Sequence, residues 1–150
     1  MRESINWQIR RFNELSLEEL YQIMSLRSEV FVVEQNCVYQ DLDHKDQIAL
    51  HVCGFYNDKL VSYSRLFDAG VYFKNPAIGR VIVSKIARNF SIGHDLMKKS
   101  ISAISEFYGS ESITISAQVY LTKFYEQHGF IPVGDEYLED RIPHIEMQKN

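Results

Sequence analysis

Residues 83–94 read Val83-Ser84-Lys85-Ile86-Ala87-Arg88-Asn89-Phe90-Ser91-Ile92-Gly93-His94, and this stretch decides the fold. The apolar, β-branched run that leads into it, residues 77–83, predicts a strand buried on both faces. From Ser91 onward apolar residues recur at helical spacing as far as Phe107, and Gly109 ends the predicted helix. In this order of strand, short polar loop and helix, the first turn of the helix has unpaired N–H groups that face the loop. Such groups suit an anion such as phosphate. The alternative interpretation is a capped helix behind a solvated loop.

On either side of this stretch the sequence predicts further helices and strands. Ser16 and Glu19 form a capping box before a helix over residues 17–31. Hydrophobic periodicity predicts the other elements: a strand at 5–12, a hairpin of strands 50–56 and 60–67, a strand at 113–117, a short helix at 121–128 and two strands within 130–147. This order predicts one domain over residues 1–150, of mixed α/β (α+β) class, around one central sheet.

Composition excludes several classes of protein. The 150 residues are 45% hydrophobic, which is typical of a globular domain and not of a disordered chain. The net charge of −4 argues against a general binder of nucleic acid or of anionic membranes. Cys37 and Cys53 are too few for a disulfide framework. No apolar run approaches the length of a bilayer span, and residues 1–4 lack the apolar segment of a signal peptide, so we expect a cytoplasmic protein.

Several potential metal ligands occur close together but match no metal-binding motif. Glu34, Asp41, Asp43, His44 and Asp46 lack both the EF-hand order and the HExxH spacing. The sequence therefore predicts no metal site.

The spacing Val83-x4-Arg88-x2-Ser91-x-Gly93 resembles the acetyl-CoA signature of the GNAT N-acetyltransferases, usually V-x4-Q/R-x2-G-x-G/A. One departure is the serine at position 91, where the family usually has glycine. Further blocks are similar to the ElaA-type branch of that family: residues 27–35 (Arg-Ser-Glu-Val-Phe-Val-Val-Glu-Gln), 39–43 (Tyr-Gln-Asp-Leu-Asp), 78–81 (Ile-Gly-Arg-Val), 136–140 (Glu-Tyr-Leu-Glu-Asp) and 142–144 (Ile-Pro-His).

The resemblance implies a GNAT-like fold whose central sheet is mixed but mostly antiparallel and flanked by helices. In this fold the strand ending at Val83 diverges from the strand ending near Ala117, and pantetheine pairs with the backbone of Val81 and Val83. The resemblance also implies that the pyrophosphate of the coenzyme lies on the backbone amides from Arg88 through Gly93 and His94. The residues expected to bind acetyl-CoA are Val81, Ile82, Val83, Arg88, Asn89, Phe90, Ser91, Ile92, Gly93 and His94.

The resemblance also implies a role for Tyr125. The run Phe124-Tyr125-x3-Gly129-Phe130 is similar to the GNAT pattern F/L-Y-x3-G-F, whose tyrosine points toward the thioester sulfur. A phenol placed there can protonate the departing thiolate. For Phe124 we expect an ordinary place in the core.

The general base is less well determined by the sequence. A primary amine with a pKa near 10 must lose a proton before it attacks. Glu34 is the first candidate because the apolar run before it predicts partial burial. His51, His144 and an ordered water are the alternatives, and for His51 a structural role is the commoner outcome.

The sequence thus predicts an enzyme that moves acetyl from acetyl-CoA to a primary amine by direct attack in a ternary complex. The acceptor is a small molecule or a peptide, and Asp41 and Asp43 are expected to order their loop and to favour a cationic one. The serine at position 91 prompts an alternative, a non-catalytic acyl-CoA-binding regulatory module. A third possibility is a protein-interaction domain that uses the acidic loop. The resemblance is compatible with a homodimer.

Overall fold

The computed structural model describes residues 1–150 and contains one seven-stranded sheet in the order β1-β2-β3-β4-β5-β7-β6. All neighbouring strands are antiparallel except β4 and β5. The strands are β1 (Asn6–Arg11), β2 (Leu50–Tyr56), β3 (Lys59–Phe67), β4 (Ala77–Val83), β5 (Ile113–Gln118), β6 (Ile131–Glu139) and β7 (Ile142–Lys149), and the helices are α1 (Leu17–Arg27), α2 (Ile92–Tyr108) and α3 (Thr122–Glu126).

The predicted fold class is confirmed, since a mixed and mostly antiparallel sheet carries helices on both faces. Two helices differ from their predicted extents. Helix α1 continues as a wider π-helical segment, Ser28–Glu34, so that helical backbone reaches beyond residue 31. Helix α3 is shorter than predicted at both ends: Leu121 belongs to a 3-10 turn, Val119–Leu121, and the helix ends at Glu126, two residues before His128. No helix of the structure has both the length and the apolarity needed to cross a membrane.

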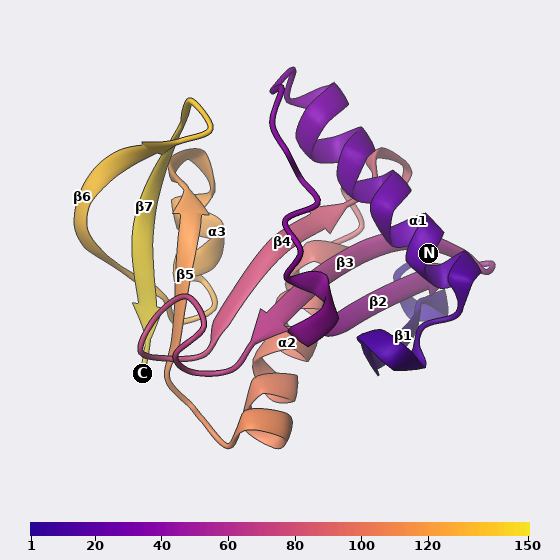
Figure 1. Cartoon of the computed structure of the whole chain (residues 1–150), viewed down its shortest axis with the longest axis horizontal. Coiled ribbons are helices and arrows are strands. Elements are labelled where there is room, and N and C mark those ends of the chain that lie inside the picture. Colours follow the sequence, from indigo (N-terminus) through magenta and orange to yellow (C-terminus); the bar gives the residue numbers. More distant parts are fainter.

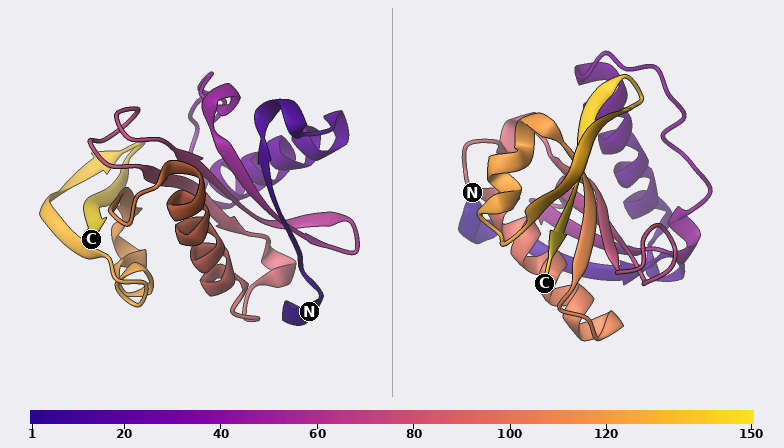
Figure 2. Two further views of the ribbon diagram at one scale, coloured as in Figure 1. Left: turned by 90° about the horizontal axis from the view of Figure 1, so that it is seen from below. Right: turned by 90° about the vertical axis from the view of Figure 1, so that its left-hand side faces the viewer.

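Alternating side chains on β2 and β3 explain why helices cover both faces of the sheet. Leu50 and Leu66 point to one face and pack in the core under α2, whereas Cys53 and Tyr63 point to the other face and pack under α1. Because successive residues of a strand face opposite sides of the sheet, the one hairpin β2–β3 packs against helices on both faces. Figure 2 shows α1 on one side of the sheet and α2 with α3 on the other.

The β4–β5 pair separates along its length. These parallel strands are in register only at Ala77 and Thr114, and the Thr114 amide donates to the carbonyl of Pro76 at 2.9 Å. Within β4, Arg80 has a positive φ of 50°, which interrupts the regular pairing with β3 and turns the strand away. In Figure 1 the two strands diverge from the bottom of the sheet upward. The splayed strand pair predicted from the resemblance is therefore present.

Candidate functional site

A cavity of about 900 Å³ lies where β4 and β5 diverge. Its walls come from β4, from the segment after α1, from the loop before β4, from α3 and from the β6–β7 hairpin. Most of its lining is apolar, as is usual for a ligand site, with a few polar groups that converge on it. Glu34 and Tyr125, the two residues predicted to act in catalysis, both line this cavity.

A second hollow, of about 320 Å³, lies at the start of α2. It shares the lining residues Val83, Arg88, Gly93 and Phe124 with the large cavity, so the two hollows adjoin. Most of the residues expected to bind the coenzyme line one or both hollows, while Phe90 lines neither and is exposed. The smaller hollow is lined by Val83, Ala87, Arg88, Asn89, Ser91, Ile92, Gly93, His94 and Phe124.

The backbone around Ser91 explains the glycine that the family usually has there. Ser91 adopts φ 61°, and Asn89 adopts φ 72°, both in the left-handed region that favours glycine. The Ser91 side chain makes no capping hydrogen bond, so the interpretation of this stretch as an ordinary capped helix is wrong. The uncapped start leaves N–H groups of the first turn without a side-chain partner.

Arg88 points its guanidinium into the large cavity, toward the end of the α1 segment. Its Nη2 lies 2.7 Å from Oε1 of Glu34, and its Nε donates to the carbonyl of Val83 at 3.0 Å. The Glu34 side chain is 21% exposed. Two groups that the sequence predicted for different tasks, coenzyme binding and base catalysis, are thus paired with each other.

Tyr125 is buried in the wall of the cavity that α3 forms. Its ring packs edge-on against Phe124 and Phe130, with centroids 5.2 and 6.1 Å away. Burial, followed by the neighbouring Tyr120, raises the pKa of Tyr125, so its hydroxyl keeps its proton at neutral pH. No protein group hydrogen-bonds to this hydroxyl. The proton is therefore free to be donated to a ligand.

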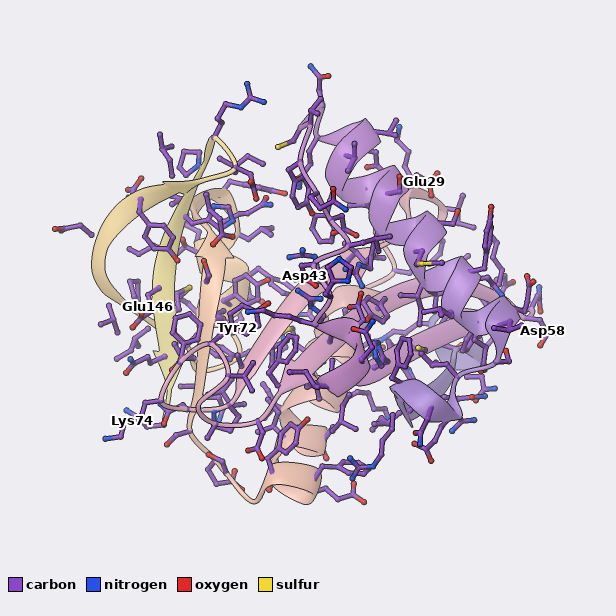
Figure 3. The ribbon with its side chains drawn as sticks, in the orientation of Figure 1. Glu29, Asp43, Asp58, Tyr72, Lys74 and Glu146 are labelled. Atoms are coloured by element: carbon purple, nitrogen blue, oxygen red, sulfur yellow. The ribbon has the colours of Figure 1, made fainter.

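The loop between α1 and β2 is held by buried ion pairs. Arg27 Nε lies 2.9 Å from Asp41, and both Arg27 Nη1 and Arg65 Nη1 contact Oδ1 of Asp46, at 2.6 and 2.8 Å. Arg65 also pairs with Asp43, which lies near the middle of the molecule in Figure 3. The aspartates do order the loop, but the prediction that they present negative charge is wrong, because each is neutralised by arginine.

Asp41 has a second partner, which ties this loop to β4. Arg80 Nε lies 2.8 Å from its Oδ1, and Arg80 Nη2 donates to its carbonyl oxygen at 3.0 Å. The Arg80 guanidinium lies over the rings of Phe31 and Tyr39. The bulge in β4 is thereby fixed on the α1 side of the cavity.

His51 is buried away from the cavity. Its Nδ1 lies 2.6 Å from the hydroxyl of Tyr63 and its Nε2 lies 2.9 Å from the carbonyl of Asp46. Burial is the main cause that lowers the pKa of His51. With both nitrogens engaged and no contact with the cavity, His51 is structural.

His144 faces the cavity from β7, next to the hairpin turn. Its Nδ1 lies 2.7 Å from the carbonyl oxygen of Ile142, and its Nε2 lies 3.4 Å from Oε2 of Glu139. The ring stacks against Tyr137, and both Tyr137 and Glu139 are linked to the Ser116 hydroxyl. Ser116, Tyr137 and Glu139 were missed as site residues. Tyr137 and Glu139 lie in the block 136–140, which supplied the resemblance and was the available signal.

The remaining candidates have structural surroundings. Burial raises the pKa of the Cys53 thiol to about 12, and Cys37 donates to the carbonyl of Asp140 at 3.2 Å. No three His, Cys, Asp or Glu side chains are grouped so as to hold a metal ion.

Comparison with known proteins agrees with this arrangement over almost the whole chain. Residues 13–150 match the family described as the acetyltransferase (GNAT) domain. Protein ElaA of Escherichia coli (strain K12) is 42% identical over 147 residues, which cover 97% of this chain and 96% of ElaA.

Two crystal structures extend the similarity to three dimensions. That of Escherichia coli ElaA has a TM-score of 0.91 at 40% identity and covers 97% of this chain and 99% of its own. A structure described as an acyl-CoA N-acyltransferase from Pseudomonas aeruginosa has a TM-score of 0.93 at 38% identity and covers 98% and 100%. A family match of this extent, with relatives this similar, shows that the chain belongs to the GNAT acetyltransferase family, beside proteins of the ElaA type.

Proposed function

We propose that this protein transfers an acetyl group from acetyl-CoA to the primary amine of a small-molecule or peptide acceptor. The amine attacks the thioester directly within a ternary complex. One observation carries the proposal: the cavity between β4 and β5 adjoins the hollow at the start of α2, and Tyr125, whose hydroxyl has no hydrogen-bond partner in the protein, lines the cavity.

The two hollows match the two halves of the coenzyme. Beyond Ala77 the edge of β4 that faces β5 is unpaired, so peptide-like pantetheine can add to it as a strand at Val81 and Val83. The helix start accepts the pyrophosphate on its free N–H groups. At Gly93 a Cβ would meet Phe124 and Val83 at an ordinary 3.5–3.6 Å, so the packing of the protein itself does not demand glycine there. In this proposal glycine is needed at position 93 because the coenzyme approaches the backbone closely there.

Tyr125 acts as the acid in this proposal. The amine nitrogen forms its bond to the carbonyl carbon, and the bond from that carbon to sulfur breaks. The sulfur takes the hydroxyl proton of Tyr125, which regains one from the nitrogen as the amide forms. Glu34, the first candidate for the base from the sequence, lines the same cavity but is held by Arg88, and its role as the base stays a prediction.

The test measures acetyl-CoA binding by calorimetry, and then the release of CoA in the presence of primary amines. Arg88→Ala should weaken binding, and the matched control Lys85→Ala, at an exposed position outside both hollows, should not. Binding with amine-dependent release of CoA supports the proposal. Binding without release for any amine would instead favour the non-catalytic regulatory module. Absence of binding by the folded wild type would exclude both.

A further inference from the structure

The β6–β7 hairpin places two hydrogen-bond acceptors side by side in the cavity wall. Nδ1 of His144 lies 2.7 Å from the carbonyl oxygen of Ile142. A carbonyl oxygen only accepts, so Nδ1 carries the hydrogen, and a neutral ring then has its lone pair on Nε2. That atom lies 3.4 Å from Oε2 of Glu139. The Nε2 atom of a neutral imidazole and a carboxylate oxygen both accept hydrogen bonds. A donor that bridges these two atoms therefore has to come from another molecule.

The surroundings of the pair hold it in place. Register sets His144 between Gln118 of β5 and Tyr137 of β6, and its ring stacks on Tyr137 with centroids 6.1 Å apart. The Ser116 hydroxyl donates to Oε1 of Glu139 at 3.4 Å, which leaves Oε2 for the His144 side. Neither group is linked to the arginines that neutralise the aspartates of the loop after α1. Glu139 is thus a carboxylate of the cavity that has no arginine partner.

Glu139 and His144 differ in how far their side chains are exposed to solvent. The Glu139 side chain is 50% exposed, whereas that of His144 is 8% exposed. Both line the same cavity as Tyr125. A cation that enters from solvent meets the carboxylate first and the imidazole second.

We propose that Glu139 and His144 form the binding site for the acceptor as a primary alkylammonium, and that Nε2 of His144 removes its proton. An ammonium group carries three N–H donors, so one nitrogen can donate to Glu139 Oε2 and to His144 Nε2 at once. The proton moves from nitrogen to Nε2 and gives an imidazolium, which remains hydrogen-bonded to Ile142 and paired with Glu139. The nitrogen keeps the freed electron pair and forms the bond to the acyl carbon. The imidazolium returns its proton to water after the product leaves.

This inference rests on the proposed function and assigns the proton acceptor to His144 and not to Glu34. The two glutamates differ in their partners. Glu34 already pairs with a guanidinium at 2.7 Å, whereas Glu139 faces an imidazole and a serine hydroxyl. The carboxylate that can attract an ammonium is the one without a permanent cation.

The binding half of the proposal is tested without turnover. In the CoA-bound protein with ¹⁵N-labelled histidine, the His144 ring signals are identified by their loss in His144→Gln. Addition of n-pentylamine should shift the Nε2 signal, and pentyltrimethylammonium, with the same charge but no N–H donor, should not. Equal shifts with both cations, or no shift with n-pentylamine, would overturn the site.

The catalytic half is tested by comparing two amines of different basicity. His144→Gln should lower kcat/KM for n-pentylamine roughly 10²-fold, the usual contribution of a positioned base. With the weakly basic 2,2-difluoropentylamine, more of which is already neutral, the loss should be smaller. Glu139→Gln should raise KM for n-pentylamine about tenfold by removing a charged hydrogen-bond partner. The matched control is Glu136→Gln, an exposed position of the same strand outside the cavity.

The outcomes separate this inference from the proposed function. CoA release that is equal in His144→Gln, Glu139→Gln and the control would contradict the amine site and leave the acetyl transfer standing. If n-pentylamine shifts the His144 Nε2 signal but the wild type releases no CoA, the amine site is supported and the acetyl transfer is contradicted. Unchanged calorimetric binding of CoA by His144→Gln shows that the variant is folded.

Discussion

The guanidinium of Arg88 and the carboxylate of Glu34 form an ion pair, with Nη2 2.7 Å from Oε1, between the two ends of the site. Arg88 belongs to the segment that leads into α2, and Glu34 is the last residue of the helical segment after α1. The pair therefore joins the hollow proposed for pyrophosphate to the wall of the cavity that the segment after α1 forms.

If Arg88 contributes to the pyrophosphate site, the coenzyme has to compete with Glu34 for it. We expect Glu34→Gln to tighten CoA binding severalfold, because the neutral amide holds the guanidinium less strongly than a carboxylate does. Calorimetry at fixed ionic strength measures this change. Glu29→Gln, at an exposed position at the start of the same π-helical segment (Figure 3), is the control and should bind as the wild type does. Weaker binding by Glu34→Gln would show that the pair supports the site.

Replacing Tyr125 with Phe should lower turnover while CoA binding stays close to the wild-type value. The ring and its contacts with Phe124 and Phe130 are kept, and only a hydroxyl without a protein partner is removed. Because the pKa of Tyr125 is raised, the proton is present throughout the neutral range, and the loss should be similar at each pH tested there. Steady-state rates and calorimetry on the same preparation separate the two effects. Tyr21→Phe, whose side chain is exposed and lies outside the cavity, is the comparison variant.

Ser91→Gly should stabilise the fold. Left-handed backbone costs a residue with a Cβ about 1–2 kcal/mol, while the freedom of glycine in the unfolded chain costs about 0.5–1 kcal/mol, so we expect a gain of about 0.5–1 kcal/mol. Ser91→Ala keeps the Cβ and removes only the hydroxyl, so it should show no such gain. Urea denaturation of the three proteins measures the difference. A gain shared by both variants would point to the hydroxyl and not to the backbone.

Asp46→Asn should destabilise the protein by about 3–5 kcal/mol, because it leaves Arg27 and Arg65 buried without a charged partner that they share. Asp58→Asn, in the exposed turn between β2 and β3, should change stability by less than about 0.5 kcal/mol. Denaturant titration at neutral pH compares the two. Similar stabilities would mean that the buried pairs contribute little.

The same aspartates predict the response to acid. Burial alone would raise the pKa of Asp46 and Asp43, but the arginine partners outweigh it and hold both pKa values below the ordinary one. The unfolded chain therefore binds protons first, at about pH 4, and stability falls as the pH drops from there through the folded pKa values. In Asp46→Asn the loss of stability with falling pH should be shallower. An unchanged slope would contradict the assignment.

Much of the fold was predictable because its signals are local. The capping box of Ser16 and Glu19 is present, with the Glu19 amide donating to the Ser16 hydroxyl at 3.0 Å, and helical spacing after Ser91 located α2. The wider turns of residues 28–34 and the extension beyond residue 31 were not predicted, since they depend on packing around Arg27 and Val30. The resemblance supplied the splayed strands, which hydrophobic periodicity does not reveal.

In the site, too, the features carried by local sequence patterns were predictable, and the contacts between distant segments were not. By itself the sequence determined the strand–loop–helix that surrounds Arg88 and Gly93 and the motif that contains Tyr125, because adjacent residues carry those patterns. Only the tertiary structure decided that Arg88 meets Glu34, that arginines neutralise Asp41 and Asp43, and that His144 lies beside Glu139 in the cavity wall. Such pairs depend on strand register and on the bulge at Arg80. Packing between distant segments sets both, and neither produces a periodic pattern in the sequence.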